Sequence, residues 1–198
     1  MENVGMTVNK RVYALIGGIA SGKTVISDIL AELGAKIVDA DVISRSFTGR
    51  GSVGEKAFIK YFPSCVIDGV PNRRLIREKV FNDPKALKLL NKITHPLILD
   101  EIDRQVALSD TVTVVVMPVP ISLNKYDGVL NVYTPIQTRI DRIVKRDNIT
   151  KELALNIISA QLSDEQAAQK SDFTFVNDGD LDKLRQAVIK WWKIFVEK

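Results

Sequence analysis

The sequence predicts an α/β fold in which a five-stranded parallel sheet carries two helical inserts. Strand-like and helix-like segments alternate along the 198 residues, an apolar β-branched run lies in mid-chain, and two helical blocks interrupt the alternation. Parallel strands are joined by crossover connections, usually helices, which cover both faces of the sheet. These observations predict a layered α/β protein of one domain.

The N-terminal segment has the pattern of a strand, a helix and a second strand. Residues 11–17 (RVYALIG) and 35–41 (AKIVDAD) have the length and apolar content of short strands, and the helix between them ends at Gly34. The run TVTVVVMP, 111–118, is almost wholly apolar and β-branched, as expected for a central strand of a parallel sheet.

Two later strands and a final helix complete the predicted core. The strands are GVLNVYT at 128–134 and FTFVN at 173–177, and the helix runs from about 180 to 196. Trp191 and Trp192 in this helix are predicted to pack rather than to form a platform for base stacking.

The two helical blocks define the predicted domain organisation. The first, about 44–107, has helical pattern and no strand, and the second, about 136–170, is predicted to be a pair of helices. Both leave the sheet at the carboxyl end of a strand, where open α/β sheets bind ligands. The core is predicted from the remaining segments, about 1–43, 108–135 and 171–198.

Composition narrows the class of protein. The net charge of +4 suits a polyanionic substrate, but the basic residues are not striped with aromatic ones as in a nucleic-acid binder. The start MENVGMTVNK lacks the pattern of a signal peptide, and no apolar run approaches the roughly 20 residues of a membrane span. Cys65, the single cysteine, is expected to pack rather than to react, and the chain is expected to be cytoplasmic.

Residues 17–24, GGIASGKT, match G-x-x-x-x-G-K-[ST], the pattern of a phosphate-binding loop. Glycines allow positive φ angles that turn backbone N–H groups toward an anion, and the following helix adds the positive end of its dipole. Lys23 is predicted to contact the β- and γ-phosphates, and the Thr24 hydroxyl to ligate Mg²⁺. The predicted ATP-binding residues of this segment are Gly18, Ile19, Ala20, Ser21, Gly22, Lys23, Thr24 and Val25.

Two aspartates lie at the end of the second predicted strand. Asp39 and Asp41 are two residues apart and are predicted to share one face of an extended strand. One carboxylate would take the proton of an attacking hydroxyl, and the other would organise the water around Mg²⁺. Capping of the next helix, for which Asp41 alone would suffice, also explains the pattern, and the spacing leaves both interpretations open.

Arg139, Arg142 and Arg146 recur at i, i+3 and i+7 in the second helical block, so they share one face of a helix. A solvated basic face is one interpretation. The other is a lid whose arginines stabilise the charge on a transferring phosphate. The position of the block after the fourth strand favours the lid.

Together these motifs resemble those of the dephospho-coenzyme A kinase family over nearly the whole chain. The resemblance rests on GGIASGKT, on DADVISR at 39–45, on RRLIREKVFND with THPLI at 73–98, and on RIVKRDNIT with SAQ and VNDG. It implies a three-layer P-loop kinase fold with a helical substrate-binding insert and a helical lid. It also implies ATP- and Mg²⁺-dependent phosphorylation of the ribose 3′-hydroxyl of dephospho-coenzyme A.

The resemblance further implies roles for individual residues. Asp41 corresponds to the general base, Lys23 to the catalytic phosphate lysine, and Arg142 to the lid arginine that meets the transferring phosphate. ATP would also contact Arg146 and Asn177. The implied substrate-facing residues are Asp39, Arg45, Arg73, Arg77 and His95, the last of which is equally explained as a structural cap before a proline.

The sequence departs from the family pattern at three places. PISLN, 120–124, stands where a Pro-Leu-Leu-Phe-Glu run is usual, so Asn124 occupies the glutamate position. Arg139 replaces a usual glutamine, and Ala20 replaces a common glycine. A related P-loop kinase with another acceptor, and a non-catalytic nucleotide-binding switch, stay open as alternatives.

Overall fold

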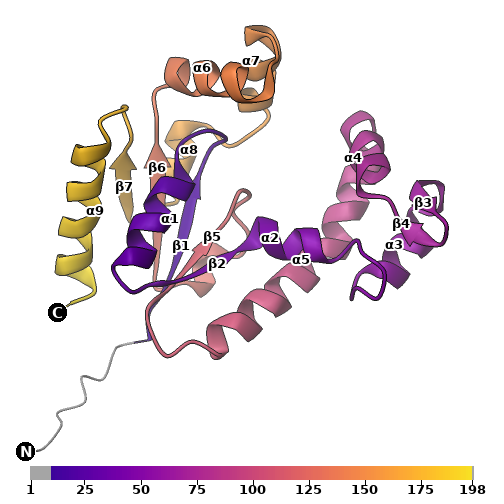
Figure 1. Cartoon of the computed structure of the whole chain (residues 1–198), viewed down its shortest axis with the longest axis horizontal. Coiled ribbons are helices and arrows are strands. Elements are labelled where there is room, and N and C mark those ends of the chain that lie inside the picture. Colours follow the sequence, from indigo (N-terminus) through magenta and orange to yellow (C-terminus); the bar gives the residue numbers. More distant parts are fainter. Residues whose placement is uncertain (1–9, 198) are drawn as a thin grey trace, which may run out of the picture. The chain divides into compact units, whose positions relative to one another are not determined.

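The structure, a computed structural model that describes residues 10–197, contains the five-stranded sheet that the sequence predicts (Figure 1). Its strands are β1 (Val12–Gly17), β2 (Lys36–Asp39), β5 (Thr113–Val116), β6 (Gly128–Tyr133) and β7 (Phe173–Val176). The order is β2-β5-β1-β6-β7. β1 pairs in parallel with β5 and β6, and β6 pairs in parallel with β7. The predicted α/β class is confirmed.

Side chains of β1 alternate between the two faces of the sheet. Tyr13 and Leu15 share one face, Ala14 and Ile16 share the other, and all four are buried. Over the Tyr13 face, α1 (Lys23–Glu32) and α9 (Leu181–Phe195) pack into one apolar cluster with the strands. The helix residues of this cluster are Ile26, Ile29, Leu30, Leu184, Val188, Trp191 and Trp192.

The two tryptophans of α9 pack as predicted. Trp191 is 3% exposed, and its ring meets the Tyr13 ring edge-on with the centroids 5.0 Å apart. Trp192 is 5% exposed in the same cluster. Edge-to-face contact adds to the free energy gained from burying the two large rings, so these residues fix α9 to the sheet.

The chain divides into two compact units. One contains the sheet, with the described residues up to Val38 and those from Leu108 onward, and the other is Asp39–Ala107. Phe58 and Phe62 lie in the core of the second unit with ring centroids 6.2 Å apart, and Cys65 is buried as expected. The helices of this unit are α2 (Ala40–Ser46), α3 (Glu55–Tyr61), α4 (Arg73–Asn82) and α5 (Pro84–Ala107), with a 3₁₀ turn at Pro63–Cys65.

The expectation that this segment contains no strand is wrong. Val66–Ile67 and Val70–Pro71 pair antiparallel as β3 and β4. Asp68 and Gly69 between them both have positive φ, 50° and 75°, as in a type I′ turn, for which Asp-Gly is a strong signal. Strands of two residues are too short to produce an alternating pattern, so only the turn could have revealed the hairpin.

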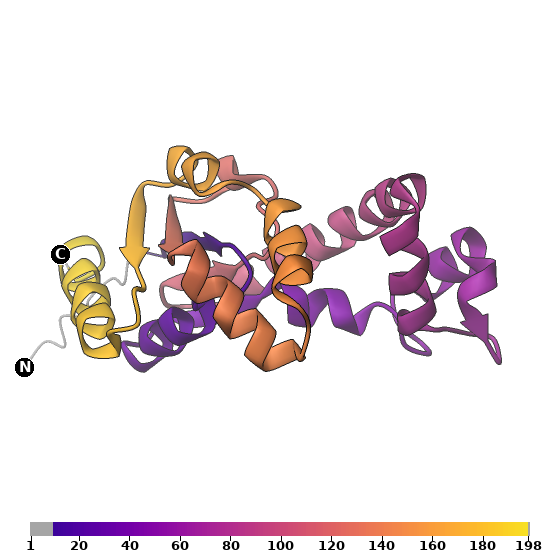
Figure 2. The same cartoon turned by 90° about the horizontal axis from the view of Figure 1, so that it is seen from above.

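The second helical block contains three helices instead of the predicted pair. They are α6 (Ile136–Asp147), α7 (Lys151–Ser159) and α8 (Asp164–Gln169), and α6 and α7 lie side by side (Figure 2). Asn148, with φ 52°, is the C-cap residue of α6, and the Thr150 side chain caps α7. Ser163 and Gln166 form a reciprocal capping box at the start of α8. This helix is too short to show helical periodicity, and the capping box is its only sequence signal.

Replacing Trp191 with alanine should lower the free energy of unfolding by about 3–5 kcal/mol, the range for large buried aromatic side chains. Urea denaturation measures the change. Leu181→Ala is the control, because Leu181 lies in the same helix and is 58% exposed, and we expect it to change stability by no more than about 0.5 kcal/mol. Equal losses in the two variants would contradict the assignment of Trp191 to the core.

Candidate active site

The phosphate-loop motif forms a tight turn between β1 and α1. Three of its residues have positive φ: Gly17 (149°), Ala20 (60°) and Gly22 (97°). Glycine adopts such angles freely, whereas the left-handed region costs other residues roughly 1–2 kcal/mol. Ala20, which stands where the family commonly has glycine, is therefore the strained point of the loop.

Two loop glycines lie against side chains from other parts of the same unit. A Cβ atom at Gly18 would be 2.1 Å from Nη2 of Arg139, and one at Gly22 would be 2.1 Å from Nδ2 of Asn177. Both distances are too short for a real Cβ contact. These glycines therefore make room for protein side chains, which the interpretation of the motif as a phosphate cradle did not anticipate.

α1 begins at Lys23, as predicted, and no protein side chain caps it. Gly22 is the N-cap residue, and the first turn holds no acidic residue. The first N–H groups of a helix have no partner within it and carry partial positive charge. Nζ of Lys23 adds a cation and donates to the carbonyl oxygens of Gly17 (2.7 Å) and Gly18 (3.1 Å). The start of α1 is thus suited to an anion such as a phosphate.

Arg142 and Asn177 contact the loop and each other. Nη1 of Arg142 donates to the carbonyl oxygen of Ala20 (3.1 Å), and Nη2 donates to Oδ1 of Asn177 (3.3 Å). Nδ2 of Asn177 donates to the carbonyl oxygen of Ser21 (2.8 Å), and its side chain is buried. The structure therefore brings together a residue of α6, the residue after β7 and the loop.

Arg139, one turn before Arg142, also reaches the loop. Its side chain is 3% exposed, and its Nε donates to the carbonyl oxygen of Ile19 (3.0 Å). Its Nη1 contacts Oδ1 of Asp164 (3.2 Å), and its Nη2 donates to Oε1 of Gln161 (3.4 Å). The interpretation of these arginines as a solvated basic face is therefore wrong for Arg139 and Arg142.

Arg146, the third arginine of the series, has a different environment. It is exposed and donates to both carboxylate oxygens of its neighbour Asp147, each at 2.8 Å. These hydrogen bonds raise the pKa of the Arg146 guanidinium above its ordinary value. The structure thus places two of the three arginines on the loop and pairs the third with an adjacent residue.

The prediction that Asp39 and Asp41 share the face of an extended strand is wrong. β2 ends at Asp39, and α2 begins at Ala40, so Asp41 lies in the first turn of a helix. Oδ1 of Asp39 accepts from the N–H groups of Asp41 (2.7 Å) and Val42 (3.2 Å). The capping role considered for Asp41 therefore belongs to Asp39, because only a side chain that precedes the helix can meet those N–H groups. Asp41 is exposed.

The other substrate-facing residues implied by the family pattern lie in the same helical unit. Arg45 is exposed in the last turn of α2, and Arg73 and Arg77 are exposed four residues apart on α4. His95 is half-buried in α5, and burial lowers the pKa of its imidazole. α5 continues through Pro96, so the alternative of His95 as a cap before a proline is wrong.

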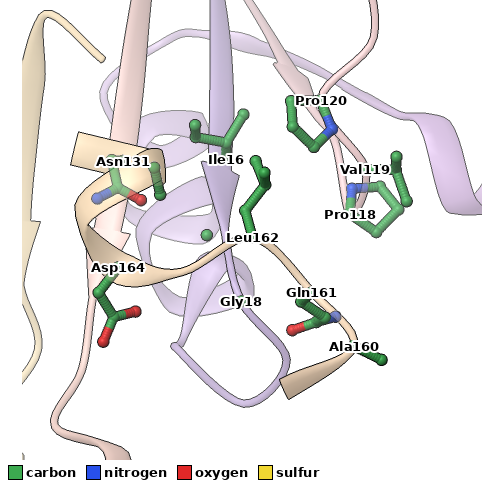
Figure 3. Close-up of a pocket in the computed structure, with 12 residues that line it drawn as sticks. Ile16, Gly18, Pro118, Val119, Pro120, Asn131, Ala160, Gln161, Leu162 and Asp164 are labelled. Carbon is green, nitrogen blue, oxygen red and sulfur yellow. The ribbon is translucent and has the colours of Figure 1, made fainter. Parts of the chain in front are cut away.

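A cavity of about 350 Å³ lies beside the start of the loop (Figure 3). Gly17 and Gly18 line it together with residues 118–120 after β5 and 160–162 between α7 and α8. Asn131 of β6 lines it too, and its Oδ1 atom has no hydrogen-bond partner among the described residues although the side chain is 3% exposed. A buried, unpaired acceptor suits a bound group with an N–H or O–H donor.

Asn131, Gln161 and Asp164 were not singled out from the sequence as site residues. An asparagine inside the apolar run GVLNVYT was the available signal for Asn131, and SAQ, quoted only as a family motif, contains Gln161. Asp164 gave no signal beyond its place in a capping box, since its contact with Arg139 joins residues far apart in the sequence.

Within residues 10–197, no group of three or more His, Cys, Asp or Glu side chains could hold a metal ion. No helix in that range is both long and apolar enough to cross a bilayer.

Comparison with known proteins identifies the family. A family model described as dephospho-CoA kinase matches residues 11–183. Dephospho-CoA kinases from Pseudoalteromonas translucida and Listeria monocytogenes are 38% and 31% identical, covering 96% and 94% of this chain and 93% and 98% of their own length. The solved dephospho-CoA kinase from Campylobacter jejuni superimposes with a TM-score of 0.64 at 26% identity, covering 95% of this chain and 98% of that one. The predicted P-loop kinase fold is confirmed, and the chain belongs to the dephospho-CoA kinase family.

Proposed function

We propose that the chain transfers the γ-phosphoryl group of ATP to the ribose 3′-hydroxyl of dephospho-coenzyme A, giving ADP and coenzyme A in the last step of coenzyme A biosynthesis. The observation that carries the proposal is the loop at 17–24, with its left-handed turns, its uncapped helix start and Lys23, in a chain of this family. Phosphoryl transfer depends mainly on positioning and on stabilising charge, which is what such groups supply.

On the nucleotide side, the N–H groups of residues 18–25 would bind the β- and γ-phosphates. Nζ of Lys23, which donates to two loop carbonyls, would exchange these partners for phosphate oxygens. Asn177, the residue after β7, would contact the adenine, and Arg146 would add charge from α6. The Arg142 guanidinium, which contacts the carbonyl oxygen of Ala20, would stabilise the charge that develops on the transferring phosphate.

On the acceptor side, Asp41 would accept the proton of the attacking 3′-hydroxyl. Its carboxylate is exposed in the first turn of α2, whereas the Asp39 carboxylate is committed to the N–H groups of that turn. Asp39 would therefore support the base by fixing the start of α2. The exposed guanidinium groups of Arg45, Arg73 and Arg77 would suit an acceptor that carries phosphates. His95, whose pKa burial lowers, would act there as a neutral hydrogen-bonding group.

Mg²⁺ binding is part of the proposal. Thr24 places an exposed hydroxyl in the first turn of α1. Mg²⁺ usually keeps several waters and is held largely by substrate phosphates, so it requires few protein ligands. This site, with one hydroxyl and no acidic cluster within residues 10–197, fits that mode of binding. Bound to Thr24, Mg²⁺ would neutralise part of the charge on the β- and γ-phosphates.

An acceptor assay tests the proposal. Purified protein with MgATP is given dephospho-coenzyme A, AMP or UMP, and ADP release is measured. We expect ADP with dephospho-coenzyme A, and phosphorus NMR of the product should show a new 3′-phosphomonoester. Release with AMP or UMP alone would indicate a related kinase, and no release with any acceptor would indicate a nucleotide-binding switch. Lys23→Ala, expected to lose about 10²-fold or more in turnover, shows that the activity comes from this site.

Asp41→Asn should lower turnover on dephospho-coenzyme A by about 10²-fold or more, because the amide keeps the shape but cannot accept a proton. The affinity for ATP should change little. Asp39→Asn is the matched variant. Asparagine still caps a helix, but the substitution removes a negative charge that would help to organise the water around Mg²⁺, so its defect should appear partly as a raised Mg²⁺ requirement. Steady-state kinetics over a Mg²⁺ series measures both. Rescue of Asp41→Asn but not of Asp39→Asn by excess Mg²⁺ would mean that the roles are reversed.

Arg142→Ala should reduce turnover far more than it weakens ATP binding, because an arginine that meets developing charge acts chiefly in the transition state. Turnover and the dissociation constant for ATP are measured separately. Arg185→Ala serves as a control for the loss of one positive charge, because Arg185 is exposed on α9 and pairs with Glu32. A raised Michaelis constant for ATP with unchanged turnover would make Arg142 a substrate anchor instead.

A further inference from the structure

Arg139 is a buried cation whose partners all lie on or beside the phosphate loop. Its side chain is 3% exposed, and burial lowers the pKa of its guanidinium while the nearby Asp164 carboxylate opposes that shift. Arginine keeps its charge in proteins, and a buried charge is retained only where it is paired. Here Asp164, Gln161 and the carbonyl oxygen of Ile19 provide that pairing.

The two polar backbone groups of Ile19 are held by side chains rather than by backbone. Its N–H donates to Oε1 of Gln161 (2.7 Å), and its carbonyl oxygen accepts from Nε of Arg139 (3.0 Å). Oε1 of Gln161 also accepts from Nη2 of Arg139 (3.4 Å). Residues from α6 and from the segment between α7 and α8 therefore fix the direction of both peptide groups of Ile19.

The next residue, Ala20, is the one with left-handed φ, 60°. Arg139 holds the peptide group before Ala20 by donating to the carbonyl oxygen of Ile19. Arg142 holds the peptide group after Ala20 by donating to the carbonyl oxygen of Ala20 itself. Alanine disfavours this conformation, whereas glycine does not. Two arginines of one helix thus hold both sides of the strained residue.

We propose that Arg139 is a positioning residue that keeps the phosphate loop in its phosphate-binding conformation by holding the peptide before Ala20. The inference rests on the proposed role of the loop in binding ATP. Arg139 itself does not touch the phosphates. A loop that loses this contact spends part of its time in other conformations. The affinity for nucleotide is then reduced in proportion to the fraction of molecules that still hold the binding conformation.

The experiment measures the dissociation constant of MgADP by calorimetry, without acceptor. Arg139→Gln should weaken MgADP binding, by about tenfold if the loop keeps its conformation about a tenth of the time. Turnover at saturating ATP should fall less than affinity, and the Michaelis constant for dephospho-coenzyme A should not change. Arg185→Gln is the control for charge and should bind MgADP as the unchanged protein does.

The Ala20→Gly background separates conformation from charge. Glycine favours the left-handed turn without help, so Arg139→Gln should weaken MgADP binding much less when residue 20 is glycine. An equal loss in both backgrounds would overturn the proposal, because it would mean that Arg139 acts through its charge alone. A lower melting temperature with unchanged MgADP affinity would also overturn it, since that is the result of a merely structural role.

Asp164→Asn tests the same contact if Arg139→Gln does not fold. This substitution weakens the contact between residue 164 and Nη1 of Arg139, so it should reduce MgADP affinity, as Arg139→Gln should. Unchanged affinity would contradict the proposal. Failure of this inference can be distinguished from failure of the proposed function. A protein that bound MgADP as described but phosphorylated a different acceptor would refute the acceptor assignment alone, whereas Arg139 variants with normal affinity in an active dephospho-coenzyme A kinase would refute this inference alone.

Discussion

The left-handed turn at Ala20 is the constraint on which the rest of the site depends. With φ of 60°, the chain reverses between the end of β1 and the start of α1, so that carbonyl oxygens face α6 and Asn177 while α1 begins without a cap. Each carbonyl on that side is satisfied by an arginine or amide side chain. Among residues 10–197, no side chain caps the start of α1, and an uncapped helix start suits an anion such as a phosphate.

The strand order explains how residues distant in the sequence meet at this turn. β1 lies between β5 and β6, and β6 lies between β1 and β7. Since parallel strands end at the same edge, the loop after β1, Thr134 after β6 and Asn177 after β7 arrive together, and both Thr134 and Asn177 donate to the carbonyl oxygen of Ser21 (2.7 and 2.8 Å). The sheet thereby supplies the support, and α6, which follows β6, supplies the two arginines.

Secondary structure and motifs that depend on the local residue pattern could be predicted from the sequence. Contacts between residues far apart in the sequence could not. The five strands of the large sheet, α1 and the loop follow from apolar periodicity and from glycine and lysine at fixed spacing. The spacing of Asp39 and Asp41 predicts an extended strand, but Asp39 caps α2, and the strand therefore ends sooner. Arg139 was recognised as one of a helical series and as a departure from the family. Its burial against Ile19, Gln161 and Asp164 depends on segments that no local pattern brings together.

In the proposed function, the protein itself builds the phosphate-binding turn before nucleotide arrives. Amide hydrogen exchange at Ile19 tests this most directly, because its N–H donates to Oε1 of Gln161 at 2.7 Å. In the purified protein without nucleotide, we expect slow exchange at Ile19 that becomes fast in Gln161→Ala. Exchange at the rate of an unprotected amide, with protection gained only on adding MgADP, would contradict this expectation, because the turn would then be formed by the nucleotide.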